Sequence, residues 1–516
     1  MNALFTLRIF NRRGFCFFIL LGLYLLSHLF FLNCDPDTLV DVHTRGAFTD
    51  EGLYTSQLRN CLNHGSFDVK ENMTYVLGPM LNFIQAPVFY VFGSKLAVSR
   101  LITLAFILIM LLCFYARSDL RNFTIFFLII GLMQFHIFQF SHYGMAEMLC
   151  VSFTMFSLLS LIIFYNKLGT HESQNAFEKN DYRRFLGAEF KTFYLLFFSN
   201  LFAAIAYAIK IQYLYIAFLP VVTSFILALI YWRCLPLRAF FYSLFFCIFF
   251  FGLYIILHYL PNKHFYDYIF FATSTEKIPS HLSDLALLFN FNFNYFLLTK
   301  YFVFYVILFC LLLVAFIGLL VKKRKENLTF LIIGIFALVW IIIEMHKLIY
   351  LYLPLRYLLS LFVALALFLS LVLSELIRQN KLMKYLVFFV LAAFLLINVS
   401  FNYAAFKRRS YDLALANKYI AKYDFGQNVV LGSWAPSLFW QNKAKTITIW
   451  NDFINDKKPI EKFKPALIIS EINESDSDSV FFKQGINLYT LSDSVRVVKV
   501  WRYKIGLFWI KQNIYK

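Results

Sequence analysis

"GFCFFILLGLYLLSHLFFLNC", residues 14–34, is an apolar run of about 20 residues, the length with which an α-helix crosses a bilayer. Arg8, Arg12 and Arg13 precede it. The run is longer than the core of a secretory signal peptide, and no small-residue cleavage site follows it. We therefore expect it to remain in the chain as the first membrane span.

Similar apolar runs recur along the chain, which has 516 residues, is 60% hydrophobic and 15% charged, and has a mean hydropathy of +0.66. A soluble protein of this size has too much surface to be so apolar. The pattern predicts a polytopic α-helical membrane protein with about 11 transmembrane helices. The runs lie near residues 14–34, 96–116, 122–140, 145–165, 192–209, 213–231, 239–259, 294–320, 328–343, 348–374 and 385–402.

The net charge of +19 is distributed in a way that indicates membrane topology rather than nucleic-acid binding. With a cytoplasmic N-terminus, the loops on that side are rich in lysine and arginine, which is a consistent positive-inside pattern. We expect an integral protein of a bacterial inner (plasma) membrane. The span count then makes the C-terminal domain extracytoplasmic. Lys407–Arg409 would lie outside, where basic residues could meet anionic lipid headgroups. The cytoplasmic bases are Arg117, Arg121, Lys167, Lys179, Arg183, Arg184, Lys191, Arg233, Arg238, Lys322, Lys323, Arg324, Lys325, Arg378, Lys381 and Lys384.

The loop after the first span, residues 35–79, is long and acidic, and we expect it on the outer side. "MLNFIQAPVFYVFG", residues 80–93, is too short to span and precedes a Gly-Ser break, so it predicts an interfacial or re-entrant helix. A second external segment runs from Pro261 to about Asn292. The charged residues of the first loop are Asp35, Asp37, Asp41, Asp50, Glu51, Asp68 and Glu71, with Arg45, Arg59 and Lys70.

The composition changes after Ser410, where Asp, Asn and Lys return. A segment with helical spacing is followed by short alternating or β-rich runs, and "ESDSDS" predicts a solvated loop among them. We expect a transmembrane domain over residues 1–409 and a soluble α/β domain over residues 410–516, without an internal repeat. The helical segment is "SYDLALANKYIAKYDF", and the strand-like runs are "NVVLGSW", "KTITIW", "PALIIS" and "VRVVKVW".

The segment "FTDEGLYTSQLRN", residues 48–60, has helical spacing and places adjacent carboxylates, Asp50 and Glu51, in the first external loop. One interpretation is structural: Thr49 caps a helix, and acids in its first turn interact favourably with the helix dipole. The other interpretation is functional, because the loop is acid-rich and leads into the short helix expected at residues 80–93.

Ionisable residues also lie near the external ends of the spans. Glu147 is one or two turns inside an apolar run, which makes it a functional candidate. Alternatively, it is a buried carboxylate bonded to a bundle partner such as His142. Snorkelling to the interface is the alternative for the cations, and it suits Lys210 and Lys347 better than Arg356, because apolar sequence follows Arg356 at once. The cations are Arg100, Lys210, His346, Lys347 and Arg356.

Acids and cations that converge at the outer membrane face suit the transfer of a sugar from a lipid phosphate to a hydroxyl. A carboxylate can accept the proton of the attacking hydroxyl as a general base. The phosphate leaving group needs no general acid, but it needs an arginine or lysine to hold its charge. One carboxylate and one cationic clamp are therefore a minimal site for inverting transfer.

The chain carries "FTDEGLYTSQLRNCLNHGSF", "GPMLNFIQAPVFYVFGSKLAVSRL" and "LPLRYLLSLFVALAL" in that order, and a soluble tail follows. This order resembles the polyprenyl-phosphate-sugar-dependent GT-C glycosyltransferases, the superfamily of protein O-mannosyltransferases and lipid A aminoarabinose transferases. The likeness covers most of the chain in layout, and the first third and one late segment in motifs. It implies a polyprenyl-phosphate sugar donor, a hydroxyl acceptor on a lipid, glycan or protein, and transfer at the outer face.

The resemblance also implies roles for individual residues. It gives Asp50 the role of catalytic base, with Glu51 beside it, and it makes Glu147 a second acidic site. Arg356 in the "RY" segment is implied to bind the lipid phosphate, with Tyr357 beside it. The further cations in the expected lipid-phosphate-binding group are Lys347, His346 and Arg100.

The main alternative is a transporter or lipid-linked-sugar flippase, which would predict midplane charges, broken helices or inverted repeats. A polysaccharide ligase or polymerase of another membrane class would usually place its large loop late in the chain. No ligand spacing requires a metal and no cofactor is expected, although the acidic first loop could hold a divalent ion. Cys34 and Cys61 flank that loop and could form a disulfide in an oxidising space. No short motif specifies the sugar or the acceptor.

Overall fold

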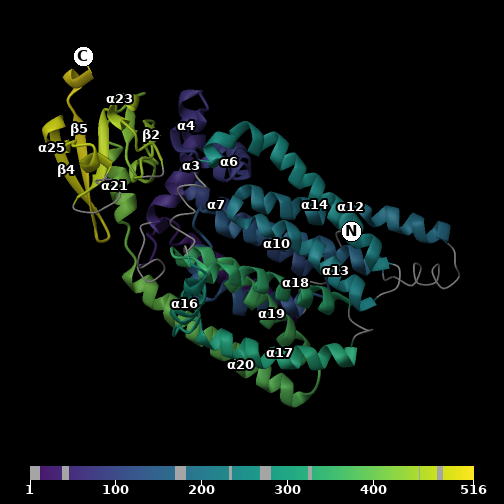
Figure 1. Ribbon diagram of the computed structural model, residues 1–516. Helices are drawn as coiled ribbons and strands as arrows, with labels where there is room; N and C mark the ends of the chain where they lie inside the picture. The colour runs from purple at the N-terminus through teal and green to yellow at the C-terminus, as the bar shows by residue number, and fades with distance from the viewer. Residues whose placement is uncertain are drawn as a thin grey trace.

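The computed structural model describes residues 12–37, 46–168, 182–231, 235–267, 281–323, 328–451, 454–472 and 480–515. The molecule consists of a bundle of long helices and a smaller sheet-containing part at one end of the bundle (Figure 1). The chain passes from the bundle to the sheet through α20 (Lys381–Arg408) and α21 (Asp412–Ile420). The predicted helical membrane bundle with an α/β tail is confirmed.

Nine helical segments in the described ranges are long and apolar enough to cross a membrane. Helices suit this environment because lipid offers no hydrogen-bond partner to the backbone. The central helix is α19, in which every residue from Leu359 to Glu375 is buried. The nine segments contain α7 (Leu96–Ala116), α10 (Ala146–Leu168), α12 (Tyr182–Ile209), α13 (Leu219–Tyr231) with the 3-10 helix η2 (Ile211–Phe218), α14 (Leu235–Tyr254), α17 (Val303–Lys323), α18 (Leu328–Glu344), α19 (Leu359–Leu376) and α20.

Two of the predicted spans correspond to shorter elements. The span predicted at residues 14–34 corresponds to α2 (Arg12–Leu29). The run at residues 122–140 is interrupted, because α8 (Arg121–Phe127) and the π-helical turn η1 (Leu128–Leu132) end before α9 (Phe135–Phe140) begins. Asparagines of α20 bond the interrupted backbone: Asn398 Oδ1 accepts from the Phe135 N–H at 3.0 Å, and Asn402 Nδ2 donates to the Met133 carbonyl at 3.2 Å. These bonds stabilise a break that would otherwise expose polar groups.

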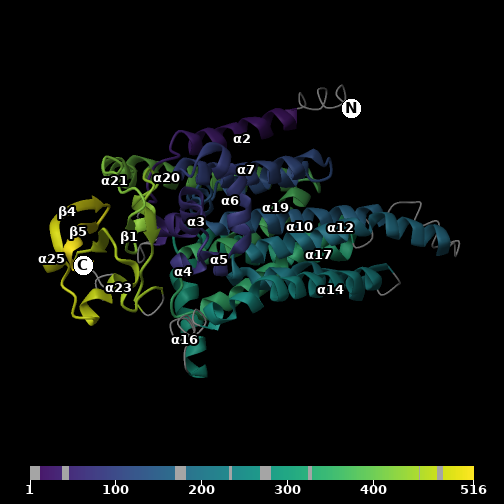
Figure 2. The same ribbon diagram turned by 90° about the horizontal axis from the view of Figure 1, so that it is seen from above.

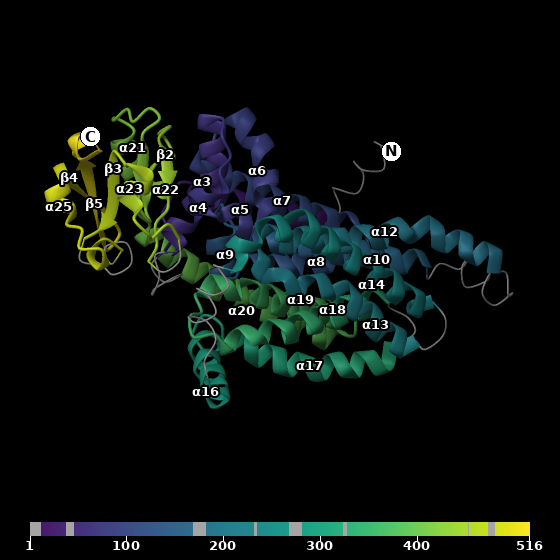
Figure 3. The ribbon, with the colours of Figure 1, turned by 45° about the horizontal axis from the view of Figure 1, so that its top comes forward.

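A group of helices between residues 46 and 92 covers the end of the bundle nearest the sheet (Figure 3). One of them, α6, has 14 residues, so the predicted short helix at residues 80–93 is confirmed. It starts close to the end of α12, since a Cβ on Gly78 would lie 2.0 Å from the Ile209 carbonyl oxygen. The group comprises α3 (Gly46–His64), α4 (Val69–Asn72), α5 (Thr74–Leu77) and α6 (Pro79–Phe92). Helix α16 (Leu282–Asn292) lies in the second segment that the sequence predicts to be external.

The sheet has five strands in the order β2-β1-β3-β5-β4. β1 runs parallel to β2 and β3, and β5 runs antiparallel to β3 and β4. Four strands coincide with the predicted runs, whereas β5 was not predicted because "YKIGLFWI" is nearly continuous in apolar character. The "ESDSDS" loop lies outside the described residues. The strands are β1 (Val429–Leu431), β2 (Lys445–Ile447), β3 (Leu467–Glu471), β4 (Ser492–Val500) and β5 (Tyr503–Ile510).

The sheet docks on the first loop through amide side chains along the outer edge of β2. Asn60 Nδ2 donates to the Thr446 carbonyl at 2.8 Å, and Asn60 Oδ1 accepts from the Thr446 N–H at 3.1 Å. Asn72 Oδ1 accepts from the Thr448 N–H at 2.7 Å. These side chains occupy backbone groups that an edge strand would otherwise leave unpaired. The docking therefore fixes α3 against the sheet domain.

Candidate active site

Asp50 and Glu51 lie inside α3 rather than at its end. The helix begins at Gly46, and its first turn contains no acid. The Thr49 carbonyl accepts a hydrogen bond from Ser437 Oγ of the sheet domain at 3.0 Å. Asp50 and Glu51 are 4% and 1% exposed. The helix-cap interpretation is therefore wrong, because both carboxylates are buried and each faces a specific cation.

Asp50 forms an ion pair with Arg356, the predicted base with the predicted phosphate clamp. Arg356 Nε lies 3.0 Å from Asp50 Oδ2, and both side chains are 6% exposed. Arg356 belongs to η7 (Leu355–Leu358), a 3-10 turn that leads into the central helix α19. A Cβ on Gly46 would lie 2.4 Å from the guanidinium nitrogens, so the start of α3 packs directly on Arg356. The fold thus joins residues that are far apart in the sequence.

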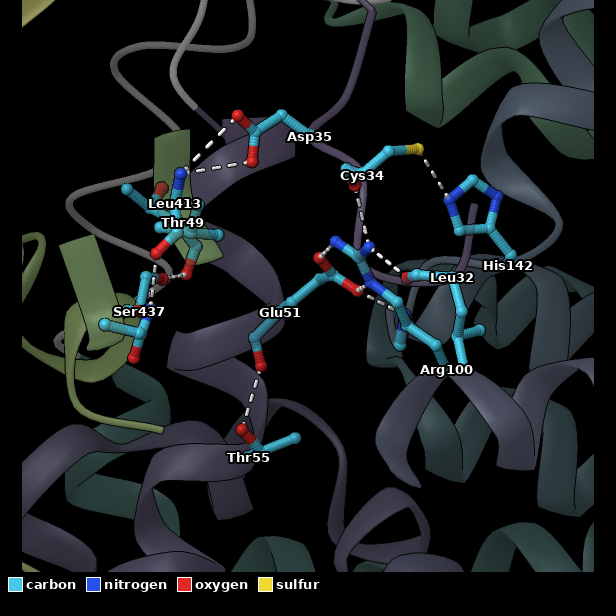
Figure 4. Close-up of polar contacts among 12 residues, drawn as sticks. Leu32, Cys34, Asp35, Thr49, Glu51, Thr55, Arg100, His142, Leu413 and Ser437 are labelled. Atoms are coloured by element: carbon cyan, nitrogen blue, oxygen red, sulfur yellow. Dashed lines mark hydrogen bonds and ion pairs between the residues drawn. The ribbon is translucent and has the colours of Figure 1, made fainter. Parts of the chain in front are cut away.

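Glu51 pairs with a different cation, Arg100 of α7 (Figure 4). Arg100 Nε and Nη2 donate to the two carboxylate oxygens at 2.9 and 2.6 Å. Arg100 Nη1 also donates to the carbonyls of Leu32 and Cys34, and the Gly144 N–H donates to Glu51 Oε1 at 2.6 Å. The pair joins the segment after α2 to α3, α7 and the start of α10. Its geometry is that of a buried structural clasp, with all three guanidinium nitrogens occupied.

Glu147, the third predicted acid, pairs with Lys210. Lys210 Nζ lies 2.5 Å from Glu147 Oε1, and the two side chains are 4% and 1% exposed. The ammonium also lies 5.1 Å from the ring centroids of Tyr54 and Tyr357. Glu147 Oε2 is buried and accepts no hydrogen bond from the part of the chain that the structure describes. Lys210 does not snorkel, because its charge is neutralised inside the protein.

His142 is not the partner of Glu147. Its Nδ1 lies 3.2 Å from Nδ1 of His28, and its Nε2 lies 3.9 Å from Cys34 Sγ. The alternative that joined Glu147 to His142 is therefore wrong, because Glu147 contacts Lys210 instead and His142 contacts His28 and Cys34.

Lys347 is also buried, and it pairs with Glu344 at the end of α18, with a distance of 2.8 Å from Nζ to Oε2. Glu344 accepts hydrogen bonds from Tyr215 Oη and from Ser360 Oγ. Lys347 Nζ donates to the Tyr357 carbonyl at 2.8 Å and lies 4.6 Å from the centroid of the Tyr213 ring. The snorkelling alternative is thus wrong for Lys347 as well.

His346 differs from its neighbour because its side chain is exposed. Its Nδ1 contacts the Ile343 carbonyl at 2.5 Å, and its Nε2 lies 3.1 Å from Tyr350 Oη. Its ring also packs edge-on against Tyr215 at 5.3 Å, so it borders the cluster without forming an ion pair in it.

Tyr54 and Tyr357 connect the ion pairs into one site. Tyr54 lies one helical turn after Asp50, and its hydroxyl experiences the charges of Lys210, Asp50 and Glu147. Burial is the largest influence on this group and raises the pKa of Tyr54. Buried charges in proteins are normally paired. The pairs Asp50–Arg356, Glu147–Lys210 and Glu344–Lys347 lie around the two tyrosines and together form one preorganised polar centre.

Several members of this centre were not predicted as site residues. Glu344 could have been singled out, because an acid at the end of an apolar run is uncommon. Lys210 was counted among the cations near the ends of the spans, with snorkelling as its alternative, and was not placed in the phosphate-binding group. Tyr54, Tyr213 and Tyr215 carry no sequence signal in a chain with 32 tyrosines. Their positions depend on the packing of remote helices.

The described residues contain no group of three or more His, Cys, Asp or Glu side chains that could hold a metal ion. Cys34 and Cys61 are free thiols in the structure, so the disulfide that the sequence allowed is not formed here. The centre therefore offers carboxylates, tyrosine hydroxyls and cations. Such a set can accept a proton and bind an anionic phosphate.

The apolar bundle, α3 with its buried acids, and the sheet domain together have the GT-C fold of membrane glycosyltransferases. ArnT from Cupriavidus metallidurans bound to undecaprenyl phosphate superposes with a TM-score of 0.57 at 13% sequence identity, over 96% of this chain and 98% of that chain. Its apo state gives a TM-score of 0.53 at 14% identity, over 94% and 97%.

The archaeal oligosaccharyltransferase AglB from Archaeoglobus fulgidus, in complex with an inhibitory peptide and a dolichol-phosphate, gives a TM-score of 0.50 at 11% identity. That superposition covers 90% of this chain and 70% of AglB. No protein-family model and no curated protein sequence matches the chain. The likeness is thus one of fold.

Proposed function

We propose that this protein is an inverting glycosyltransferase that moves one sugar from a polyprenyl-phosphate donor to a hydroxyl acceptor. The observation that carries the proposal is the buried contact between Asp50 and Arg356 at 3.0 Å, because it joins a general base to a phosphate-binding cation. Two proteins of the same fold support the choice of donor, since their structures hold undecaprenyl phosphate and a dolichol-phosphate.

In the proposed reaction, the donor phosphate replaces Asp50 as the partner of Arg356. The carboxylate of Asp50 is then free to accept the proton of the acceptor hydroxyl. The hydroxyl oxygen attacks the anomeric carbon, the bond from that carbon to the phosphate oxygen breaks, and polyprenyl phosphate leaves with its charge on Arg356. A single displacement of this kind inverts the anomeric centre.

The neighbouring pairs have supporting roles in this proposal. Lys347 and Tyr357 lie next to Arg356 and would complete the phosphate site. Glu147 would orient the sugar or the acceptor with its Oε2, while its Oε1 stays paired with Lys210. Arg100 and Glu51 would hold α3 in place through their clasp, and His346 would act at the exposed rim.

The proposal includes a topology. The N-terminus would be cytoplasmic, residues 1–409 would form the transmembrane domain with its first external loop, and residues 410–516 would form a domain on the outer face. Sugar transfer would then occur at the outer side of the inner membrane. The first loop has seven acids and only three bases, which supports an outer location, because loops rich in lysine and arginine stay on the cytoplasmic side.

Kinetics of purified variants test the assignment. With undecaprenyl-phosphate-linked pentoses and hexoses as donors and a bacterial lipid and glycan extract as acceptor, we expect Asp50→Asn to lower kcat and to leave KM for the donor nearly unchanged. Arg356→Gln should raise that KM as well. Exposed control variants Asp493→Asn and Arg378→Gln should match the wild type. Normal transfer by both site variants would refute the assignment.

A further inference from the structure

Arg59 is a buried cation of α3 that lies where this helix contacts the sheet domain (Figure 2). Arg59 is 4% exposed, and its Nη2 donates to the carbonyls of Pro436 at 2.6 Å and of Gly52 at 3.1 Å. Pro436 belongs to α22 (Ala435–Leu438), a short helix of the sheet domain. Arg59 follows Asp50 by nine residues, or about 14 Å along the helix, so it lies apart from the ion-pair centre.

No carboxylate of the described residues contacts the Arg59 guanidinium. By contrast, each of the other buried lysines and arginines in the described ranges lies within 3.0 Å of a carboxylate oxygen. Burial lowers the pKa of Arg59 to about 9, so its guanidinium stays protonated at neutral pH. A buried charge is unfavourable unless a counter-charge compensates it. The compensated pairs are Arg100–Glu51, Lys210–Glu147, Lys347–Glu344 and Arg356–Asp50.

A second buried donor lies against this guanidinium. Arg59 Cζ is 4.0 Å from the centroid of the Trp440 ring, and Trp440 is 5% exposed. Neither the Arg59 Nε–H nor the Trp440 Nε1–H has an acceptor in the part of the chain that the structure describes. Both groups can only donate, and buried donors normally have an acceptor. An oxyanion would accept from both N–H groups and would also supply the missing negative charge.

The two donors lie close beneath the surface of the sheet domain and α3. Gln441, which follows Trp440 directly, is exposed, and so is Asn63, one helical turn after Arg59. Lys443 is exposed as well and brings a further positive charge to the segment after Trp440. An anion could therefore reach the two N–H groups from the solvent without passing through the helical bundle.

We propose that Arg59 and Trp440 bind an oxyanion of the phosphate class between α3 and the sheet domain. The Arg59 Nε–H and the Trp440 Nε1–H would each donate to a phosphate oxygen. Inorganic phosphate and the phosphate of a lipid headgroup share this chemistry. Because one donor belongs to α3 and the other to the sheet domain, the bound anion would also hold these two parts together. The site does not depend on the proposed sugar transfer.

Titration calorimetry and melting curves of the delipidated full-length protein in a maltoside detergent test this site, with inorganic phosphate and a short-chain phosphatidic acid as probes. We expect a probe to raise the melting temperature of the wild type, and chloride at equal ionic strength to leave it unchanged. Arg59→Met should weaken binding of that probe by at least about tenfold, because it removes the charge. Trp440→Phe keeps a ring without the N–H and should weaken it severalfold. Arg502→Met removes an exposed arginine that lies 4.6 Å from the Trp501 ring, and it should bind as the wild type does.

The proposal also predicts that Arg59→Met melts in phosphate-free buffer at or above the wild-type temperature, since an apolar side chain replaces an uncompensated buried charge. Tighter binding of inorganic phosphate would assign the site to a free ion, and tighter binding of phosphatidic acid would assign it to a lipid headgroup. Three results would overturn the proposal: no binding of either probe by the wild type, equal affinity of the wild type and both site variants, or a large loss of stability of Arg59→Met in phosphate-free buffer. The last result would mean that the two carbonyls already satisfy the guanidinium.

Discussion

Asp50 and Glu51 are neighbours in the chain but have different partners, because successive side chains on a helix point about 100° apart. Asp50 faces Arg356 and the tyrosines, and Glu51 faces Arg100 and the Gly144 N–H. The acids and cations were predictable as candidates, from the acid-rich loop after the first span and from the ends of the apolar runs. Their pairing was not, since it depends on how helices hundreds of residues apart pack together.

Glu51→Gln should destabilise the protein rather than only slow its reaction. It would leave the fully buried Arg100 guanidinium without its counter-charge, which typically costs about 3–5 kcal/mol. Thermal unfolding in detergent measures the loss, and the double variant Glu51→Gln/Arg100→Gln should recover part of it. A Glu51→Gln protein with wild-type stability and no activity would instead make Glu51 a catalytic residue.

At the scale of elements, α3 is positioned by close contacts from two sides. The sheet domain fixes one side through Asn60, Asn72 and Ser437, and Arg356 packs against the first turn at Gly46. The short helix at residues 80–93 and four of the five strands were predictable from periodicity and length. The break near residue 133 was not, because partners on α20, remote in sequence, stabilise it.

Gly46→Ala should lower sugar transfer more than it lowers stability. The added methyl would lie 2.4 Å from the Arg356 guanidinium, and that flexible side chain can move away, which would separate it from Asp50. We expect a loss of at least tenfold in kcat/KM, as misplacement of a reacting group by about 1 Å can cause. Gly22→Ala on α2 is the control, because nothing lies within 4 Å of its added methyl. Equal activity of the two variants would contradict the proposed contact.

Asn60→Ala combined with Asn72→Ala should loosen the sheet domain from α3. Asn60→Ala removes the partner of the Thr446 N–H in β2, and Asn72→Ala removes that of the Thr448 N–H just after β2, at about 1–3 kcal/mol per buried group. Hydrogen exchange at the Thr446 and Thr448 amides should accelerate. Asn428→Ala, an exposed position of the same domain, serves for comparison. Unchanged exchange in the double variant would mean that the amide side chains do not hold the edge.

At the scale of the whole molecule, the fold places the acid-bearing helix α3 and the sheet domain at the same end of the bundle (Figure 3). The number of apolar runs and the helical class were predictable, because membrane thickness fixes the length of a span. The docking of the sheet domain on α3 was not, since it depends on single asparagine, arginine and tryptophan contacts such as Arg59 over the Trp440 ring at 4.0 Å.

The C-terminus should lie outside the inner membrane. A bacterial alkaline phosphatase fused after residue 516 should therefore be active, because that reporter forms its disulfides only in an oxidising compartment. The same reporter fused after residue 323, at the end of α17, should be inactive. The reverse pattern would invert the proposed topology and move the reaction to the cytoplasmic face.

The most direct measurement of the central claim is the release of polyprenyl phosphate by purified protein in liposomes without an ion gradient. With undecaprenyl-phosphate-linked sugars and an acceptor extract, the wild type and Asp493→Asn should cleave the donor, and Asp50→Asn should be slower by about 10²–10⁴-fold, the usual contribution of a general base. Movement of intact donor across the bilayer with no bond cleavage, or undiminished cleavage by Asp50→Asn, would contradict the proposed mechanism.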